Sequence, residues 1–532
     1  MQRSFFKVKT MLFNSLSFII FFVVVTFAYF LLPHRYRWIL ILAASCYFYM
    51  SFIPKFILIL VTTITIDYFA GIGLEKFTGN KRKWLLATSL IANVGLLAFF
   101  KYFNFFNANL LNLANFIGWH YPIHALEIIL PIGLSFHTFQ SLSYTIEVYK
   151  GRQKAERHFG ILAEYVLFYP QLVAGPIERP QNILPQLHAE HKFDYQRVTD
   201  GLKWMAWGMF KKVVIADRMS LLVNHVYKSP SDYSGPMLVF ATLAFSIQIY
   251  CDFSGYSDIA LGSAQVMGIK LMKNFSHPYF AKSVPEFWQR WHIALSTWLR
   301  DYIHIPLSRK LLTKNRESKR LKWAFSLLVT FLVSGLWHGA AWTFVIWGTL
   351  HGVYMVFTGL AINAWRNIST KFPLHFPPLL TNFLSRLLTF LLVSYAWIFF
   401  RASNITDAKY ISANIFVGWH RLLADGHKIY TVLINGLAEK GISNTLVMKS
   451  SFTKIVNLLT PESPPFVLLT LFPLVIFLVI EIQQYNKDFL EKFNSWPKHL
   501  RWLSYATLIA TTLIFGTAYA NTSGQAFIYF QF

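Results

Sequence analysis

Long apolar segments separated by short polar connections make up most of this chain. Apolar runs of about 20 residues recur, the length that crosses a bilayer as a helix, as in LSFIIFFVVVTFAYFLL (16–32) and LLTFLLVSYAWIFF (387–400). Backbone polar groups inside a bilayer must be satisfied internally, so such runs are expected to be helical. The pattern therefore predicts an all-α polytopic membrane protein. The expected spans lie near 14–32, 37–53, 55–74, 84–103, 127–148, 160–175, 200–222, 236–251, 321–338, 341–363, 380–400, 465–483 and 502–520.

The stretch 250–306 departs from this pattern. It is apolar but contains scattered Asp, Glu, His, Arg and Pro residues, and it does not divide into clean spans. Irregular backbone survives at membrane depth when it is buried in protein, so broken or re-entrant helices in a buried core are expected here. We find no internal repeat and no soluble domain, which predicts a single integral membrane domain over 1–532. Residues 1–10 are a possible N-terminal extension, with Met11 as an alternative start.

The composition is that of a membrane protein, and it changes how the net positive charge is interpreted. The chain is 55% hydrophobic and 14% charged, against roughly 25% charged for a soluble domain. The net charge of +25 comes from 49 Lys and Arg against 24 Asp and Glu. These basic residues concentrate in the short connections, which is the topology signal of membrane proteins. We therefore expect membrane lipid, and no nucleic acid, as the surrounding partner.

The charged connections set the predicted orientation. The segments 308–322 and 75–84 are strongly basic and are expected on the cytoplasmic side,. Counting spans from them places 402–464 and the C-terminus outside. His338 follows Lys322 by sixteen residues, which is about 24 Å along a helix. His338 is therefore expected inside the membrane, nearer the external side.

Two histidines are the main candidates for chemistry. His338 lies in GLWHGAAWTFVIWG (335–348), where small residues leave room for close packing or a ligand and Trp337 and Trp342 are expected to wall a passage. His292 lies in EFWQRWHIALSTWLRDYIHIPL (286–307), which mixes acids, arginines and tryptophans. A titratable residue inside a membrane is costly, and this favours a functional role. The alternatives are a hydrogen-bonded structural histidine for His338 and an interfacial amphipathic helix for the second segment.

Metal and nucleotide chemistry are poorly supported by the motifs. His292, His338 and His351 do not form an HExxH or HxxxH spacing, so no metal site is expected, and no Walker motif or GxSxG pattern occurs,. On one continuous helix His338 and His351 would face apart unless the chain breaks between them. A neutral imidazole suits general-base catalysis. Direct His-assisted transfer between a donor and an acceptor is thus favoured over a covalent enzyme.

Several long motifs together resemble the membrane-bound O-acyltransferase (MBOAT) family, in particular its bacterial alginate O-acetyltransferase-like branch. The motifs are PIGLSFHTFQSLSYTIEVYKG (131–151), QLVAGPIERP (171–180), YCDFSGYSDIALG (250–262), EFWQRWHIALSTWLRDYIHIPL (286–307) and GLWHGAAWTFVIWGTLHG (335–352). The start MLFNSLSFIIFF and the end FIYFQF also resemble that branch. The resemblance thus covers nearly the whole chain.

The resemblance implies a ring of tilted transmembrane helices, with re-entrant helices, around a central tunnel. It implies a cytoplasmic donor, acetyl-CoA, with no permanently bound cofactor and no assigned donor-binding residues. The acceptor would be an exported, alginate-like polysaccharide, reached through a periplasmic acetyltransferase partner at the bacterial inner membrane. His338 matches the family's catalytic histidine and His292 its second histidine. The implied supports of the tunnel or the histidines are Asp252, Arg300, Asp301, Trp291 and Trp337.

Two other readings stay open. One is a proton-coupled transporter or flippase that uses His292 and His338 as a proton relay, although the absence of a repeat weakens it. The other keeps the fold and changes the cargo, to D-alanine for teichoic acid or acetyl for peptidoglycan. The basic segment 308–322 is either an attractor of anionic acetyl-CoA or a plain topology determinant,.

Overall fold

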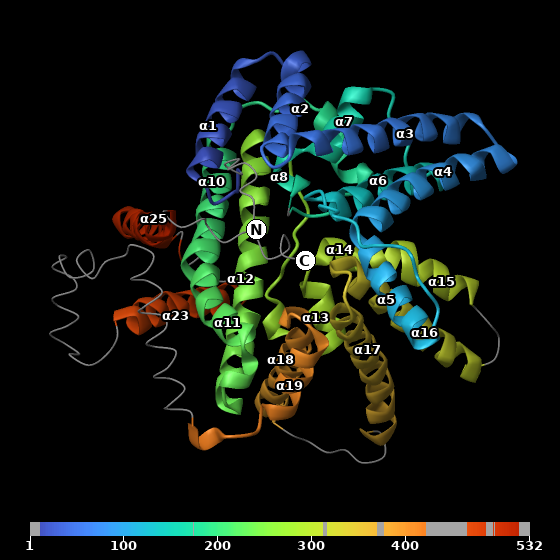
Figure 1. Ribbon diagram of the computed structural model, residues 1–532. Helices are drawn as coiled ribbons and strands as arrows, with labels where there is room; N and C mark the ends of the chain where they lie inside the picture. Colours follow the sequence, from blue (N-terminus) through green and yellow to red (C-terminus); the bar gives the residue numbers. More distant parts are fainter. Residues whose placement is uncertain are drawn as a thin grey trace.

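The computed structural model describes residues 11–173, 175–311, 316–369, 377–421, 465–485, 493 and 495–520. These residues form helices joined by loops, and none of them lies in a strand (Figure 1). The all-α class is therefore confirmed. The possible extension 1–10, residues 422–464 of the predicted external stretch and the C-terminal FIYFQF lie outside the described residues.

The N-terminal half builds an outer group of helices and the first part of the core. Its helices are α1 (Leu16–Leu31), α2 (His34–Met50), α3 (Ile57–Lys76), α4 (Gly79–Leu97), α5 (Phe103–Phe116), α6 (Leu134–Tyr149), α7 (Phe159–Leu167), α8 (Tyr169–Leu172), α9 (Pro180–His188), α10 (Tyr195–Met209), α11 (Asp217–Lys228) and α12 (Gly235–Met267). Short helical turns η1 (Pro54–Phe56) and η4 (Pro230–Asp232) precede α3 and α12.

The C-terminal half contributes short broken helices and then long ones. They are α13 (Val284–Arg290), α14 (Ile293–Leu299), α15 (Ile305–Lys310), α16 (Arg316–His338), α17 (Trp342–Ser369), α18 (Pro378–Arg401), α19 (Ile405–Asn414), α23 (Pro465–Tyr485) and α25 (Lys498–Ala520), with turns η5 (Pro278–Phe280) and η7 (Trp419–Arg421).

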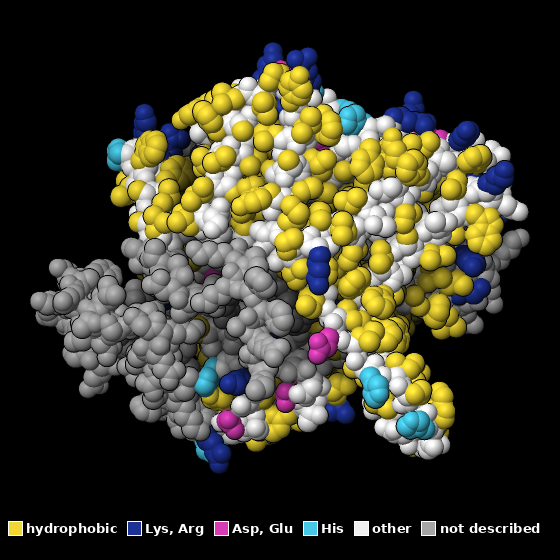
Figure 2. All heavy atoms as spheres, turned by 45° about the horizontal axis from the view of Figure 1, so that its top comes forward, with side chains coloured by type: hydrophobic (Ala, Val, Ile, Leu, Met, Phe, Trp, Pro, Cys, Tyr) yellow, Lys and Arg dark blue, Asp and Glu magenta, His cyan; other side chains and the backbone are white. Residues whose placement is uncertain are grey.

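Six helices in the described part of the chain are long and apolar enough to cross a membrane. They are Pro54–Lys76, Gly79–Phe116, Gly235–Met267, Lys319–His338, Trp342–Ala361 and Pro378–Arg401. Large apolar side chains on the outer helices are exposed, for example Leu16 at 72% and Phe357 at 70%. Figure 2 shows a broad hydrophobic surface with Lys and Arg side chains along its margins. Together these features describe a multi-pass membrane protein.

Helix α12 runs through the core, and it corrects one boundary. The sequence predicted a span that ends near 251, but α12 continues to Met267 and ends at Gly268, which has a φ of +98°. The acids that suggested a broken helix are ion-paired, Asp252 with Lys212 at 2.6 Å and Asp258 with Lys211 at 2.7 Å. The irregular stretch therefore begins at 268 rather than 250.

Glycines let α10 lie against α12. A Cβ on Gly262 would approach the carbonyl oxygen of Gly201 to 2.4 Å, and one on Gly255 would approach that of Gly208 to 2.7 Å. The close approach of α10 explains why so many small residues occur along an otherwise apolar helix.

Among the described residues, three π-helical segments interrupt longer helices: η2 (Ala98–Tyr102), η3 (Phe210–Ala216) and η6 (Arg300–His304). Such segments insert an extra residue into a turn and redirect the chain, often at functional sites. Figure 1 shows that the chain changes direction between α4 and α5, where η2 lies. The predicted span 84–103 is thus part of a longer, bent helix.

Two predicted spans are shorter in the structure. The apolar segment 127–148 begins as extended chain and becomes helical only at Leu134. The segment 160–175 contains the nine-residue α7 and the single turn α8, both buried. From Leu134 onward, and across α7 and α8, most of these residues are buried, whereas Ile129 is 61% exposed, so neither segment is a simple span.

Candidate active site

The end of α16 places His338 at the wall of a cavity. His338 is the last residue of α16, and the chain reverses over 339–341 before α17 begins at Trp342. Its side chain is 4% exposed and lines a cavity of about 770 Å³, which we call the histidine cavity. The other walls come from η2, from the residues before α6 and from those after α18. The volume lies within the range of small-molecule sites.

Glycines hold α16 and α17 in backbone contact beside this cavity. A Cβ on Gly335 would lie 2.2 Å from the carbonyl oxygen of Phe344, and one on Gly348 would lie 2.3 Å from that of Phe331. Residues 339–341 line the cavity itself. The small residues of this motif therefore serve both close helix packing and the shape of the cavity.

Aromatic rings fix the orientation of the His338 imidazole. Its ring centroid lies 4.9 Å from that of Trp337, 4.9 Å from that of Trp347 and 5.2 Å from that of Phe400, each in an edge-to-face arrangement. Such packing restricts a ring to one orientation. Trp347 also contacts His351, at 5.0 Å. The break at 339–341 thus brings the two histidines to the same tryptophan.

Lys101, which the sequence analysis did not single out, holds the backbone at His338. Its Nζ donates to the carbonyl oxygens of Trp337 (2.6 Å) and His338 (3.0 Å), and the Tyr102 hydroxyl donates to that of Leu336 (2.6 Å). The last carbonyls of a helix have no partner within it and carry partial negative charge, so a buried ammonium group stabilises them. Lys101 also lines the histidine cavity.

His292 lies in the break between α13 and α14. The sequence allowed one continuous helix here, with Trp288, Trp291, Leu295 and Trp298 on one stripe, but His292 has a φ of +43° and ends that continuity. Asn274 stabilises the break, because its carbonyl oxygen accepts from the Ile293 N–H at 2.9 Å. Left-handed backbone at a non-glycine residue is strained, and such strain clusters at functional sites.

Trp337 lies between the two candidate histidines. The ring centroid of His292 is 6.0 Å from that of Trp337, and His338 contacts the same indole. His292 is fully buried and packs also against Phe136 and Phe253. It lines neither the histidine cavity nor the basic cavity described below. The structure therefore brings the two histidines near one another but gives only His338 access to the histidine cavity.

Among the residues that the structure describes, no group of three or more His, Cys, Asp or Glu side chains is arranged to hold an ion. The Nδ1 of His351 accepts a hydrogen bond from the Trp288 indole at 3.2 Å. His351 thus has a packing role beside the site.

A second cavity, of about 480 Å³, lies at the other end of α6. We call it the basic cavity, because four of its lining side chains are Lys150, Arg152, Arg179 and Arg309. Glu147 and Asp301 are its acids, and Tyr302 and Gln181 also line it.

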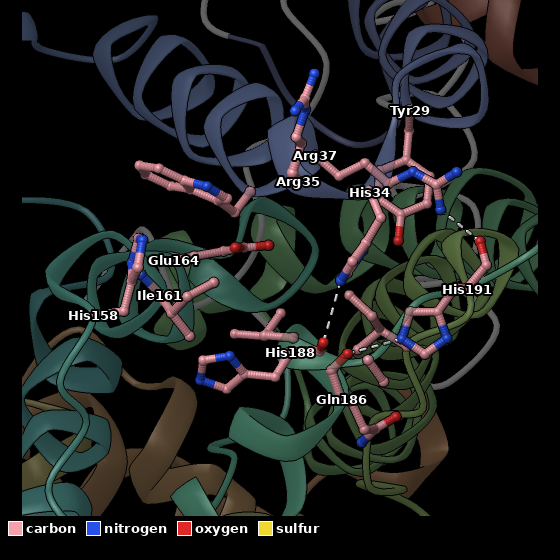
Figure 3. Close-up of a pocket in the computed structure, with 14 residues that line it drawn as sticks. Tyr29, His34, Arg35, Arg37, His158, Ile161, Glu164, Gln186, His188 and His191 are labelled. Carbon is pink, nitrogen blue, oxygen red and sulfur yellow. Dashed lines mark hydrogen bonds between the residues drawn. The ribbon is translucent and has the colours of Figure 1, made fainter.

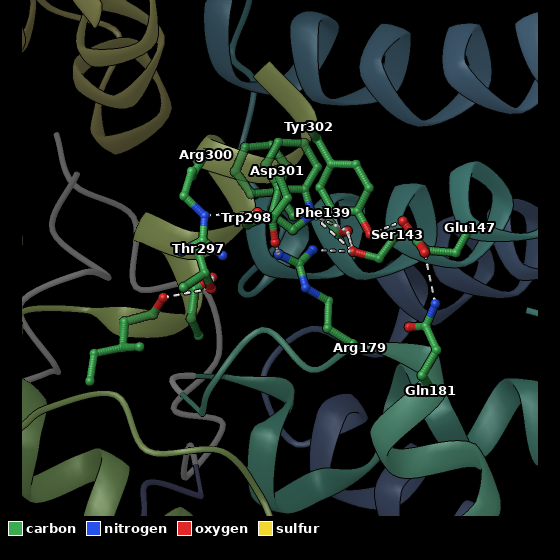
Figure 4. Close-up of polar contacts among 12 residues, drawn as sticks. Phe139, Ser143, Glu147, Arg179, Gln181, Thr297, Trp298, Arg300, Asp301 and Tyr302 are labelled. Atoms are coloured by element: carbon green, nitrogen blue, oxygen red, sulfur yellow. Dashed lines mark hydrogen bonds and ion pairs between the residues drawn. The ribbon is translucent and has the colours of Figure 1, made fainter. Parts of the chain in front are cut away.

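Arg300 and Asp301, both predicted as supports of the tunnel or the histidines, belong to the region of the basic cavity. Asp301 pairs with Arg179 at 3.4 Å and with Arg300 at 2.8 Å, and Figure 4 shows these groups around Tyr302 and Glu147. The Tyr302 hydroxyl donates to Glu147 at 3.0 Å.

Helix α6 separates the two cavities. Phe136 lines the histidine cavity and Glu147 the basic cavity, and eleven residues of helix correspond to about 16 Å. Phe139 fills the space between, with its ring stacked on Trp298 at 3.8 Å and on Trp337 at 5.5 Å. The Trp298 indole donates to the Phe139 carbonyl oxygen at 2.9 Å (Figure 4). Phe139 with Trp298 and Trp337, which we call the aromatic partition, thus packs along α6 between the residues that line the two cavities.

Two further predicted supports lie in the packed core. Asp252, on α12, pairs with Lys212 of η3. The next residue, Phe253, contacts His292. Trp291 is 1% exposed and packs against Trp397 at 5.1 Å. Of the predicted set, Trp337 and His338 line the histidine cavity and Asp301 lines the basic cavity.

Two residues of these cavities carried a signal that the sequence analysis did not use. Lys101 is a lysine inside an apolar segment, and Arg179 lies in the quoted motif QLVAGPIERP. Charged residues in membrane segments are rare and usually functional, so both positions invite attention. Their partners, however, come from distant parts of the chain.

Comparison with known proteins agrees with this architecture. The family model of the membrane-bound O-acyltransferases matches residues 26–400. A probable alginate O-acetylase of Pseudomonas aeruginosa is 37% identical over 385 residues, which cover 71% of this chain and 70% of the relative. A peptidoglycan O-acetyltransferase of Helicobacter pylori is 35% identical over 443 residues, covering 76% and 80%. A teichoic acid D-alanyltransferase of Streptococcus thermophilus is 28% identical over 277 residues, covering 46% and 65%.

The family match spans the helices that build both cavities, from α1 to Phe400 of α18. It includes the broken helices around His292 and the reversal after His338. The chain therefore belongs to the membrane-bound O-acyltransferase family and is an O-acyltransferase.

Proposed function

We propose that this protein takes an acetyl group from cytoplasmic acetyl-CoA and moves it across the bacterial inner membrane for O-acetylation of an exported polysaccharide. The observation that carries the proposal is the pair of cavities at opposite ends of α6, one containing His338 and the other rich in Lys and Arg. Two relatives named as acetyl-transferring proteins support acetyl as the cargo.

The basic cavity suits the donor. Acetyl-CoA carries several phosphate charges, and Arg forms paired hydrogen bonds with phosphate oxygens. Arg179 and Arg309 line this cavity. Arg82 donates to the Tyr149 carbonyl oxygen at the end of α6, which connects the cavity to the basic segment 75–84 that the sequence places on the cytoplasmic side. The thioester would then extend along α6 toward the aromatic partition.

The histidine cavity suits the acceptor. A neutral His338 takes the proton from an acceptor hydroxyl as that oxygen attacks the thioester carbonyl carbon. The C–O bond forms, the C–S bond breaks, and the leaving thiolate takes the proton from the imidazolium. Coenzyme A is released as the free thiol and the acceptor carries the ester. In this scheme the acetyl group passes Phe139 while the nucleotide stays in the basic cavity.

His292 is a positioning residue in this proposal. It contacts Trp337, which in turn contacts His338, so it orients the wall against which the thioester carbonyl would lie. Arg300 and Asp301 hold Arg179 at the donor cavity. Asp252 and Trp291 stabilise the helices that carry His292.

The acceptor is delivered from the external side, through a periplasmic acetyltransferase partner. Relatives differ in the acceptor that their names give, alginate, peptidoglycan or teichoic acid. The alignments with the alginate and peptidoglycan relatives cover more of this chain than the alignment with the teichoic acid relative, which favours acetyl transfer to a glycan. We propose an alginate-like polymer as the acceptor.

The test measures coenzyme A release from radiolabelled acetyl-CoA by the purified protein, with alginate oligosaccharide and periplasmic extract supplied as the acceptor. We expect turnover in the wild type and none with His338→Ala. The matched control is His137→Asn, because His137 is equally buried, bonds Thr63 and lines neither cavity. Full turnover by the folded His338→Ala variant contradicts the proposal. Proton movement without thioester cleavage would identify a transporter instead.

A further inference from the structure

A third cavity lies apart from the two that flank α6. It has a volume of about 230 Å³ and lies between the α1–α2 turn, α7 and the end of α9 (Figure 3). It shares no lining residue with the histidine cavity or the basic cavity. Its apolar walls are Trp38, Ile161, Leu187 and Ile269. We call it the α1–α2 cavity.

A buried carboxylate reaches into this cavity. Glu164 is on α7, is 3% exposed and lines the cavity. Its Oε2 has no hydrogen-bond partner among the described residues. Figure 3 shows the Glu164 side chain extending from α7 toward the α1–α2 turn. A buried carboxyl oxygen without a donor is costly, and a cationic group with N–H donors in the cavity would remove that cost.

The rim of the cavity is cationic. Arg35 and Arg37 line it, and neither forms an ion pair with a carboxylate in the described part of the chain. The Arg37 side chain donates to the carbonyl oxygens of His191 (2.6 Å) and Leu32 (3.0 Å), which fixes it in place. Arg35 is exposed. The site thus combines one buried acid with basic groups nearer solvent.

This arrangement matches a ligand with an ammonium group at one end and an anion close behind it. The cavity adjoins the apolar outer surface, because Leu31 at the end of α1 is 68% exposed and Ile39 on α2 is 47% exposed. A primary ammonium has three N–H donors for a carboxylate, whereas a quaternary ammonium has none. Phosphate is the anion that arginine pairs with best.

We propose that the α1–α2 cavity binds a phosphoethanolamine group, with the ammonium at Glu164 and the phosphate at Arg35 and Arg37. Two sources carry this chemistry: the headgroup of phosphatidylethanolamine in the bilayer and soluble glycerophosphoethanolamine. The volume fits the headgroup and leaves acyl chains to the apolar surface beside it. This site is independent of acyl transfer.

The test is native mass spectrometry of the full chain, reconstituted in nanodiscs with equal phosphatidylethanolamine and phosphatidylcholine. The wild type should retain phosphatidylethanolamine preferentially. Glu164→Gln keeps the shape but loses the charge, and we expect its preference to fall about tenfold, the loss of one charge-assisted hydrogen bond. Arg35→Gln, at an exposed position, removes a group that would pair with the phosphate. It should therefore weaken the retention of both lipids and leave the preference for phosphatidylethanolamine unchanged. Glu127→Gln, at another exposed position that does not line this cavity, is the control and should behave as wild type.

The measurements can contradict the proposal, and they distinguish the bilayer lipid from the soluble compound. Equal retention of the two lipids by the wild type, or an unchanged preference in the folded Glu164→Gln variant, overturns the proposal. Thermal stabilisation of detergent-purified protein by phosphatidylethanolamine and not by glycerophosphoethanolamine assigns the site to the bilayer lipid. Equal stabilisation by both, lost in Glu164→Gln, assigns it to the soluble compound.

Discussion

Replacing Lys101 by Met tests whether the end of α16 must be held for His338 to act. The change keeps the length of the buried stem and removes the ammonium that donates to the carbonyl oxygens of Trp337 and His338 at 2.6 and 3.0 Å. Each hydrogen bond from a charged donor contributes about 1.5–3 kcal/mol. Part of this is offset because the buried ammonium is no longer desolvated.

The expected effect appears in turnover rather than in donor binding. Without the ammonium the chain reversal at 339–341 loosens, and a displacement of about 1 Å at a reacting group costs about a hundredfold in rate. We therefore expect kcat to fall by about 10- to 100-fold. The KM for acetyl-CoA should stay within about twofold, because Lys101 lines the histidine cavity and not the basic cavity.

The assay is steady-state coenzyme A release by purified Lys101→Met protein, with alginate oligosaccharide and periplasmic extract as the acceptor and Lys76→Met as the control. Lys76 is exposed at the end of α3 and lines neither cavity of α6. A variant with an unchanged melting temperature and wild-type kcat would refute the positioning role of Lys101. A rise in KM alone would place Lys101 in donor binding instead.

Three further predictions follow from the packing and the charges. Arg179→Gln should raise the KM for acetyl-CoA several-fold at low salt, and the difference should shrink as ionic strength rises,; equal KM values at low salt contradict the donor assignment. Gly348→Val should lower the melting temperature sharply, because its Cβ would lie 2.3 Å from the Phe331 carbonyl oxygen,; a wild-type thermal scan contradicts this. Lys212→Met should cost about 3–5 kcal/mol in denaturant unfolding in detergent, because both Asp217 and Asp252 lose this ion-pair partner,; adding Asp252→Asn should recover only part of the loss, and wild-type stability of the single variant contradicts this.

The sequence predicts the helical class, because apolar runs of membrane-spanning length are a local pattern. A chain break between His338 and His351 is only an open alternative in the sequence, and the structure has it at 339–341. The same reasoning misjudges α12. Its acids look incompatible with a membrane helix until Lys211 and Lys212, forty or more positions away, are known to pair with them.

The cavities could not be predicted, because each is built from segments far apart in the chain. Lys101 caps a helix more than 230 residues later. In the sequence His292 lies one position from the stripe of a continuous helix, and only its backbone, held by Asn274, reveals a break. The aromatic partition depends on Phe139 meeting Trp298 and Trp337 across three helices.

The most direct test of the account is sided acetyl transfer in proteoliposomes. Acetyl-CoA labelled in its acetyl group is added on the face of the basic cavity, and alginate oligosaccharide with periplasmic extract is trapped inside. We predict that the wild type delivers label to the lumen while coenzyme A stays outside, and that His338→Ala delivers none. Label in the lumen with the His338→Ala protein, or entry of intact acetyl-CoA with the wild type, would contradict the account.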